Sequence, residues 1–242
     1  MREDNRVELG VDEKYISSSE IQDIIWNFET YKDLNQEEKD SLLERIIYSA
    51  EEGEGDGHIC NQLGAMYAEG KLVEVDEKKS FEWYKKSSQL GYALGTCNLG
   101  FSYMYALGTD QNYEEAYKCF SEAANFGMTD ALVRLGDMYG YGYYVEKNNI
   151  KAYKMYCMAY NYSKNNLTDL AAYQAYSDAT IRLGNCYYYG YGVEKDILKA
   201  YHYYSEAYYY YLLRKKMGDS YYQSGLEKSR EKVTHIITEL EE

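Results

Sequence analysis

The feature that most constrains this chain is a segment that returns along it in a fixed register. A Leu-Gly pair, with tyrosine three residues after the glycine, lies within Ala131–Gly142 and again within Ala179–Gly190. The same skeleton occurs at Leu63-Gly64, at Leu99-Gly100 and, in degenerate form, at Met217-Gly218. Successive copies lie 36, 36, 48 and 34 residues apart. Such a period is typical of stacked supersecondary units, so it decides the fold class before any other signal.

Each repeat carries the signals of two helices. Seven residues after the leucine, a glycine marks the end of the first helix, where a left-handed residue is favoured (Gly70, Gly142, Gly190). Twenty-one residues after it an aromatic returns in the second helix (Tyr84, Phe120, Tyr156, Tyr204). We expect the glycine of Leu-Gly to lie where two helices cross, because a larger residue would overpack the crossing by about 1–3 kcal/mol. One hairpin cannot bury its apolar stripe alone, so the sequence predicts an all-α array of antiparallel helical hairpins that share one core.

The segments outside the repeats predict caps. Ser17 with Glu20 and Asn35 with Glu38 form capping-box patterns, and apolar residues follow each at helical spacing. The predicted organisation is a flexible N-terminus (1–16), an N-terminal capping hairpin (17–57), the repeats (58–225) and a C-terminal capping helix (226–242). Within 58–225 the copies lie at about 58–91, 92–127, 128–163 and 175–210, with a partial copy at 212–225. The extra length at 161–176 predicts a longer hairpin loop or an extended first helix, and either a binding feature or a neutral spacer.

Charge and cysteine content exclude several functions. The net charge of −14 disfavours nucleic acids and anionic membrane surfaces, because both would be repelled. The five cysteines are well separated and form no CxxC pair, which favours reduced thiols over a metal or redox motif. No apolar leader and no run of eighteen apolar residues is visible. We therefore expect a cytoplasmic protein that inserts into no membrane.

Two motifs imitate functional sites. Gly140-Tyr-Gly142 and Gly190-Tyr-Gly192 look like phosphate-binding loops, but no strand precedes them, so we interpret them as helix-connecting turns. Ser229 and Lys232 match the Ser-x-x-Lys nucleophile motif, but its companion motifs are missing. The three histidines have no metal-ligand spacing. The sequence therefore predicts no catalytic residue, no metal site and no cofactor, and we expect a protein that is not an enzyme.

The register resembles the Sel-1-like repeat (SLR) family, a relative of the tetratricopeptide repeats. The fourth repeat matches its pattern most fully, through Ala179, Leu183, Gly184, Tyr187, Gly190, Gly192, Val193, Asp196, Lys199, Ala200, Tyr203, Tyr204 and Ala207. The resemblance implies a right-handed, tetratricopeptide-like α-solenoid that acts as a protein-interaction scaffold or adaptor. Its motif residues are structural, so it transfers no catalytic site. Two alternatives remain: a cysteine-poor relative of the β-lactamase-like repeat hydrolases, whose paired cysteines this chain lacks, and an exported host-interaction effector.

The same resemblance implies that the first helix of each hairpin lines a concave side. The residues then expected to face a partner are Asn61, Glu69, Phe101, Met104, Tyr105, Asp130, Asp137, Tyr141, Asp178, Asn185, Tyr188, Tyr189, Asp219 and Tyr222, beside His58, Cys97 and Lys215. This set is aromatic and acidic. It favours a protein or peptide partner, basic or polar, held by stacking on tyrosine and charge-assisted hydrogen bonds to aspartate. The alternative is a solvated wall without a ligand.

Overall fold

A computed structural model describes residues 16–17, 19–21, 24, 31, 33–52, 56–168, 170–219 and 221–241. Helices, turns and loops account for all of these residues, and none of them lies in a strand. The chain divides into two compact units, Met1–Gln111 and Asn112–Glu242, which are described separately.

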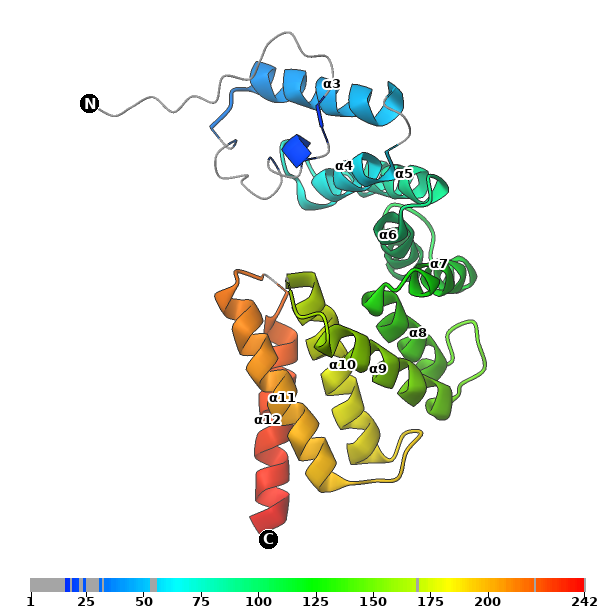
Figure 1. The fold of residues 1–242 in the computed structure, drawn as a ribbon, viewed down its shortest axis with the longest axis vertical. Helices are drawn as coiled ribbons and strands as arrows, with labels where there is room; N and C mark the ends of the chain where they lie inside the picture. The colour runs from blue at the N-terminus through cyan, green and yellow to red at the C-terminus, as the bar shows by residue number, and fades with distance from the viewer. Residues whose placement is uncertain are drawn as a thin grey trace, which may run out of the picture. The chain divides into compact units, whose positions relative to one another are not determined.

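The first unit contains four of the labelled helices in Figure 1. These are α3 (Gln36–Glu52), α4 (Gly57–Glu69), α5 (Glu77–Gln89) and α6 (Ala93–Tyr105). Neighbours in the sequence pack together, and α4 also contacts α6. Ile46, Leu63 and Met66 lie in the buried core that α3 shares with α4.

The second unit continues the same arrangement. It contains α7 (Tyr113–Asn125), α8 (Thr129–Tyr141), α9 (Asn149–Lys164), α10 (Leu170–Tyr189), α11 (Ile197–Lys216) and α12 (Gln223–Glu241). Each helix packs on the next, while α8 also contacts α10 and α10 contacts α12 (Figure 1). Helical hairpins that stack through their first helices define an α-solenoid, so the predicted fold class is confirmed.

A recurring cap fixes how each hairpin turns. Positions are counted here from the leucine of each Leu-Gly pair. At position +13 stands Asp or Asn, whose side chain accepts a hydrogen bond from the first turn of the second helix: Asp76, Asn112, Asn148 and Asp196. Such N-caps contribute about 1 kcal/mol each. The backbone N–H groups of Asp76, Asn148 and Asp196 also donate to the carbonyl of the tyrosine at +4, at 2.8–2.9 Å. In these three repeats, hydrogen bonds therefore tie the loop between the two helices of the hairpin to both helices.

The glycine at +1 lies at a helix crossing, as predicted, and the structure shows that the aromatic ring at +21 covers it in three repeats. A Cβ on Gly64 would lie 2.5 Å from the Tyr84 ring, and one on Gly184 would lie 2.7 Å from the Tyr204 ring. Gly136 meets Tyr156 in the same way. Only a residue without a side chain lets the two helices approach this closely.

Successive repeats are joined by aromatic pairs. The ring at +18 of one repeat meets the tyrosine at +4 of the next edge to face, at centroid distances of 5.3–6.1 Å: Phe81–Tyr103, Tyr117–Tyr139 and Tyr153–Tyr187. The two tyrosine pairs also join their hydroxyls, at 2.8 and 2.9 Å. Edge-to-face rings contribute about 0.5–1.5 kcal/mol beyond their buried area. Part of the tyrosine abundance is thus used between repeats.

Gly190-Tyr-Gly192 is a turn, as predicted, whereas Gly140 and Tyr141 are the last residues of α8 and only Gly142 lies in the turn that follows. Gly142 is a left-handed C-cap with φ of 79°, and Gly190 and Gly192 have φ of 73° and 74°. In the second repeat the left-handed cap is Ala106, with φ of 58°. Neither Gly-x-Gly segment opens a phosphate-binding helix.

At the N-terminal end the two predicted capping boxes are present. Ser17 N–H donates to Glu20 at 2.8 Å, and Asn35 N–H donates to Glu38 at 2.8 Å. The predicted flexible segment 1–16 and the first helix of the predicted capping hairpin fall mostly outside the described residues. Helix α3 continues to Glu52, and α4 begins at Gly57 behind its N-cap, Asp56, one residue before the predicted start of the repeats at 58.

The insertion lengthens helices on both sides of its loop. Helix α9 has 16 residues and α10 has 20, against 13 in α8. The extended first helix expected for the fourth repeat is thus present. Its added turn is packed: Tyr176 is fully buried, stacks on Tyr160 at 5.0 Å and donates to Glu206 at 2.6 Å.

The copy expected at Met217-Gly218 forms no first helix. Met217 ends α11, and Gly218 has φ of 81° in the turn before α12. Helix α12 then begins at Gln223, three residues before the capping helix expected from Leu226. The sequence similarity arises because a glycine that ends a helix and a glycine at a helix crossing can follow the same kind of apolar residue.

A matched pair of substitutions on α8 tests the role of the crossing glycine. Gly136→Ala should lower the free energy of unfolding by about 1–3 kcal/mol, because its Cβ meets the Tyr156 ring. Gly140→Ala, one turn later, places its Cβ at an ordinary 3.6 Å from the Tyr156 hydroxyl, so it should stabilise by about 0.5–1 kcal/mol through helix propensity. Urea denaturation measures both. Equal effects of the two substitutions would contradict this account of the crossing.

Candidate functional site

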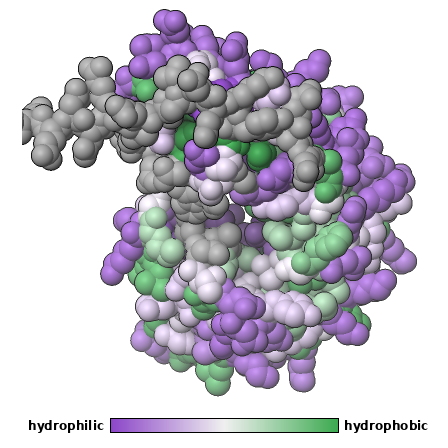
Figure 2. Space-filling view, turned by 45° about the horizontal axis from the view of Figure 1, so that its top comes forward, coloured by the Kyte–Doolittle hydropathy of each residue, from purple (hydrophilic) through white to green (hydrophobic). Residues whose placement is uncertain are grey.

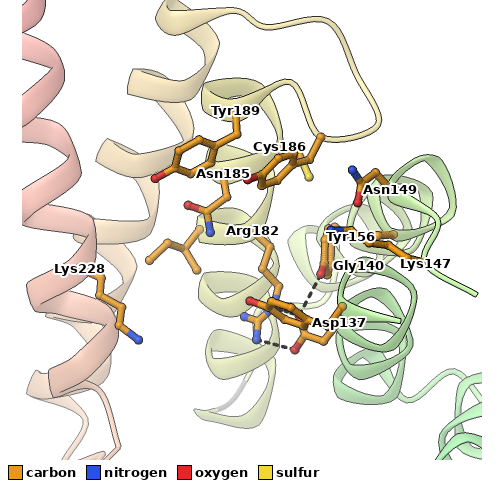
Figure 3. A pocket seen from close by; sticks show the side chains of 14 residues that line it. Asp137, Gly140, Lys147, Asn149, Tyr156, Arg182, Asn185, Cys186, Tyr189 and Lys228 are labelled. Atoms are coloured by element: carbon orange, nitrogen blue, oxygen red, sulfur yellow. Dashed lines mark hydrogen bonds and ion pairs between the residues drawn. The ribbon is translucent and has the colours of Figure 1, made fainter. Parts of the chain in front are cut away.

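The second unit contains a cavity of about 540 Å³. Its walls are formed by α8, α9, α10 and α12 and by the loops that follow α8 and α10. In the view of Figure 3, α12 with Lys228 faces α8 and α9 with Lys147 and Asn149, and α10 lies between them. Of the residues expected to face a partner, this cavity brings together Asp137, Tyr141, Asn185 and Tyr189.

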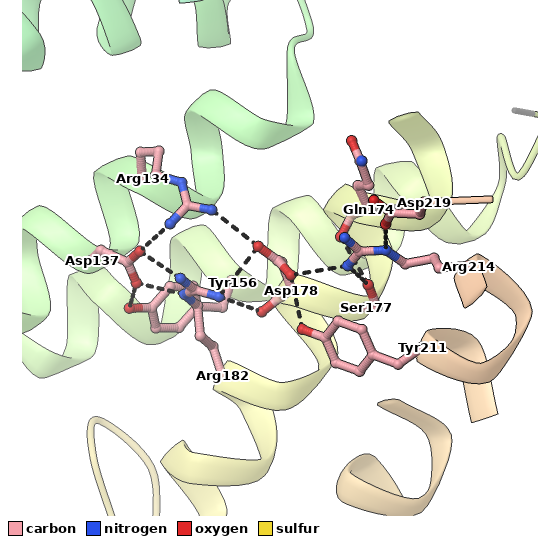
Figure 4. Close-up of polar contacts among 10 residues, drawn as sticks. All are labelled: Arg134, Asp137, Tyr156, Gln174, Ser177, Asp178, Arg182, Tyr211, Arg214 and Asp219. Carbon is pink, nitrogen blue, oxygen red and sulfur yellow. Dashed lines mark hydrogen bonds and ion pairs between the residues drawn. The ribbon is translucent and has the colours of Figure 1, made fainter. Parts of the chain in front are cut away.

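The carboxylate of Asp137 is fully occupied by hydrogen-bond donors (Figure 4). Its Oδ1 accepts from Arg182 Nε at 2.6 Å and from the Tyr156 hydroxyl at 2.9 Å. Its Oδ2 accepts from Arg182 Nη2 at 2.7 Å and from Arg134 Nη1 at 3.0 Å. A carboxylate offers about four acceptor positions. Asp137 therefore has none left for a basic ligand.

Asp178 links this cluster to the end of α11. Its side chain accepts from Arg134 Nη2 at 3.0 Å and from the Tyr211 hydroxyl at 2.8 Å, and Arg214 Nη1 lies 3.4 Å away. Arg214 also donates to Asp219 at 2.6 Å. We call Arg134, Asp137, Asp178, Arg182, Arg214 and Asp219 the arginine–aspartate network. It joins α8, α10, α11 and the turn after α11.

The charges of the network shift one another's pKa. Burial alone would raise the pKa of Asp178, but Arg182 and Arg134 lower it below its ordinary value. Burial would lower the pKa of Arg182, but Asp137 raises it well above the ordinary value. Asp130, at the start of α8, has its pKa raised to about 6 by burial and by the neighbouring Asp178. Asp130 borders the network, and keeping its carboxylate ionised at neutral pH costs folding free energy.

Three further side chains on the cavity wall offer hydrogen-bond donors. The Asn185 carbonyl oxygen accepts from the buried Tyr204 hydroxyl at 2.7 Å, so its NH₂ group is left as a donor. Lys147 and Lys228 are exposed and, among the described residues, neither has a hydrogen-bond or ion-pair partner.

Tyrosines form the rim of the cavity. Tyr141 stacks on Tyr143 at 5.5 Å, and Tyr189 stacks on Tyr191 at 5.2 Å, in equivalent positions of the third and fourth repeats. Tyr141 remains 69% exposed and Tyr189 46% exposed, so both rings offer a face to a partner. Lys232 donates to the Tyr189 hydroxyl at 2.8 Å and holds that ring in place.

The other expected residues of the second unit lie elsewhere. Asp130, Asp178 and Asp219 belong to or border the arginine–aspartate network. Tyr188 is partly buried, near Lys232 and His235 of α12. Tyr222 lies in the turn before α12 and packs on the core that α11 shares with α12, with Lys215 Nζ 5.8 Å from its ring.

The expected residues of the first unit differ in accessibility. Asn61 is buried and accepts from Asn98 at 2.9 Å, and Met104 is also buried. Glu69 is exposed and pairs with Lys71 at 2.7 Å. Phe101 and Tyr105 stack at 6.2 Å, and Tyr105 is 53% exposed. Tyr105 is the accessible aromatic residue of this group.

Sequence reasoning missed the basic residues of the site. Arg134 and Arg182 occupy position −1 in the third and fourth repeats. The spacings Arg134–Asp137 and Asp178–Arg182 are three and four residues, which place each pair on one helix face and could have revealed it. Lys147 and Lys228 carried no such signal, since one lies in a loop and the other beyond the last repeat.

The reactive side chains near the cavity are not activated. Ser229 is buried and donates to the Leu226 carbonyl, while Lys232 donates to Tyr189, so the two form no nucleophile–base pair. Burial raises the pKa of Cys186, which lines the cavity, to about 12, and that of Cys119 to about 12. These thiols stay protonated at neutral pH. All five cysteines are free.

In the part of the chain that the structure describes, no group of His, Cys, Asp and Glu side chains is arranged to hold a metal ion. Within the same residues, no helix has the length and apolar character needed to cross a bilayer.

The fold and the site together define a helical-repeat protein whose recurring positions pack the hairpins and whose cavity combines recurring residues, such as Tyr156, with residues that differ between repeats, such as Asp137. A family model of the Sel1 repeat matches residues 60–92, 93–125, 129–161 and 177–212. These matches cover more than half of the chain, which therefore belongs to the Sel1 repeat family. No curated protein matches the sequence.

Two bacterial proteins are among the solved structures that match this chain. A Sel1 repeat protein from Oxalobacter formigenes is 22% identical, with a TM-score of 0.55, over 85% of this chain and 84% of that one. The protective antigen c5321 of uropathogenic Escherichia coli strains, which displays an SLR fold, is 18% identical, with a TM-score of 0.46, over 92% of this chain and 72% of that one. The similarity to the Oxalobacter formigenes protein supports the α-solenoid fold.

The stability of the second unit should depend on Arg182. Arg182→Gln leaves Asp137 with two fewer donors and removes a cation near Asp178, so we expect a loss of about 2–4 kcal/mol in the free energy of unfolding. Arg230→Gln, on an exposed position of α12, is the matched control and should change it by less than about 0.5 kcal/mol. Urea denaturation at pH 7 measures both. A loss no larger than the control's would show that the network does not stabilise the fold.

Asp130 should make stability depend on pH. Because its pKa is raised from 3.8 to about 6 in the folded state, its ionisation opposes folding, and stability is lost as pH rises from about 4 to above 6. Asp130→Asn removes this loss. The variant should be about 1–2 kcal/mol more stable than the natural chain at pH 7.5 and nearly equal to it at pH 4. Denaturation curves at both pH values provide the measurement, and a gain independent of pH would contradict the assignment.

Proposed function

We propose that this protein is a non-enzymatic, cytoplasmic scaffold that binds a protein partner through the exposed tyrosines and polar groups of its repeats. Sel1 repeats generally mediate protein–protein interaction. The observation that carries the proposal is the cavity of the second unit, whose rim presents Tyr141 and Tyr189. Tyrosine is enriched among residues that dominate binding energy, because it buries a large area and keeps a polar tip.

Surface composition supports recognition by a few anchors. On the face drawn in Figure 2, hydrophilic residues predominate and hydrophobic ones form scattered patches. This face therefore does not provide a broad apolar interface. Recognition through a small number of aromatic residues surrounded by polar groups fits it better.

The aspartates of the second unit do not support the basic partner that the sequence suggested. Asp137, Asp178 and Asp219 already accept hydrogen bonds from arginine, so a basic peptide would have to displace those contacts. A basic partner is better matched by residues 1–111, which carry 11 Lys and Arg against 23 Asp and Glu, a net −12. For the second unit we therefore consider a partner segment that is not basic.

Capture of partners from the native cell tests the proposal. The double variant Tyr141→Ala/Tyr189→Ala should capture its partner at least about tenfold less than the natural chain, because two aromatic anchors are removed. Tyr162→Ala, 54% exposed at the end of α9 and outside the cavity, is the matched control. Adding Tyr105→Ala extends the test to the first unit. An unchanged set of captured proteins, with an intact circular dichroism spectrum, would refute this function.

A further inference from the structure

The cavity of the second unit has a charge opposite in sign to that of the whole protein. Lys147, Arg182 and Lys228 line it, and Asp137 is the one acidic residue on its wall within the described part of the chain, which gives a net lining charge of +2. The chain as a whole carries −14. Residues 112–242 hold 15 Lys and Arg against 17 Asp and Glu, a net −2. Positive charge is thus concentrated at this cavity.

The lining carboxylate cannot bind a cation from a ligand. Asp137 accepts four hydrogen bonds from Arg134, Arg182 and Tyr156, which fill its acceptor positions. Its charge is balanced within the protein. A basic ligand would therefore find no free anion on the wall.

Several donors on the wall remain available. Lys147 and Lys228 have no hydrogen-bond or ion-pair partner among the described residues. Arg182 uses three of its five N–H groups, on Asp137 and on the Asp178 carbonyl, and the Asn185 NH₂ group is free because its oxygen accepts from Tyr204. In Figure 3 these side chains come from both sides of the cavity. These free groups are all hydrogen-bond donors, and three of the four side chains that carry them are cationic.

We propose that this cavity binds the carboxylate side chains of an acidic segment of a partner protein. The proposal rests on the function proposed above and specifies the partner chemistry at one site. Carboxylates match lysine, arginine and amide donors by charge-assisted hydrogen bonds. The exposed faces of Tyr141 and Tyr189 beside the cavity offer apolar area for the rest of the segment. The volume of about 540 Å³ falls within the range of about 300–1,000 Å³ that is usual for ligand pockets.

Fluorescence anisotropy with defined peptides tests the proposal on the full chain. The probe is a C-terminally amidated peptide of alternating Glu and Gly, with a neutral fluorophore. The matched peptide replaces each Glu by Gln, and a third peptide has uncharged side chains and a free C-terminal carboxylate. We expect the Glu peptide to bind, with an affinity that falls as salt is raised, and the other two to bind at least about tenfold more weakly.

Substitutions in the cavity identify where the peptide binds. Lys147→Gln and Lys228→Gln should each weaken binding of the Glu peptide about two- to fivefold, and the double variant about tenfold. Lys216→Gln, an exposed lysine at the end of α11 that does not line the cavity, should change it by less than about 1.5-fold. The variant Lys147→Glu/Lys228→Glu changes the lining charge from +2 to −2. It should lose the Glu peptide and bind a peptide of alternating Lys and Gly instead.

Three results would overturn the proposal: equal affinity for the Glu and Gln peptides, binding only of the free C-terminus, or unchanged affinity in the folded double variant. If the Glu peptide fails to bind while capture of a partner still depends on Tyr141 and Tyr189, the acidic-segment assignment is wrong and the scaffold function stands. If the Glu peptide binds at the lysines but capture does not depend on the tyrosines, the tyrosine-based scaffold function fails instead.

Discussion

The close approach of two helices at Gly64, Gly136 and Gly184 governs both the fold and the site. The ring that covers the glycine also carries a hydroxyl, and in the third and fourth repeats this hydroxyl reaches the residue after the glycine. Tyr156 covers Gly136 and donates to Asp137, and Tyr204 covers Gly184 and donates to Asn185. The same kind of packing contact, made once in each of these two repeats, therefore orients one polar side chain of the cavity per repeat. Loosening the crossing would move the wall as well as the core.

The orientation of Asp137 decides the chemistry of that wall. Held by Tyr156, it receives Arg182 through two hydrogen bonds and Arg134 through one. A row of aspartates that appears acidic in the sequence thus becomes a balanced ion network, and the groups left over are donors. This is why residue type alone suggested a basic partner and the hydrogen-bond arrangement favours an acidic one. The hydrogen bonds from Arg182 and Arg134 to Asp137 thus both stabilise the network and leave mainly donors free in the cavity.

Local and repeated features could be predicted from the sequence. The hairpins, the turns at Gly142 and Gly190 and the crossing at Gly136 follow from spacing within one repeat. Contacts between helices were harder, because the Arg182–Asp137 bond depends on the offset between α8 and α10, which no local pattern sets. Lys228 was out of reach, since α12 lies beyond the repeats. Met217-Gly218 misled because its glycine ends a helix and crosses none.

The repeats also show how recognition can change while packing does not. At position +2 the first and second repeats carry Ala65 and Phe101, whose side chains offer no acceptor, and the second repeat carries Phe120 at +21, which has no hydroxyl. The third and fourth repeats carry Asp137 and Asn185 at +2 under a tyrosine. The glycine at +1 and the aromatic ring at +21 are the same in all four. Substitution at +2 and −1 therefore alters the polarity of the surface while the helix crossing keeps its geometry, and polar recognition can be confined to particular repeats of one array.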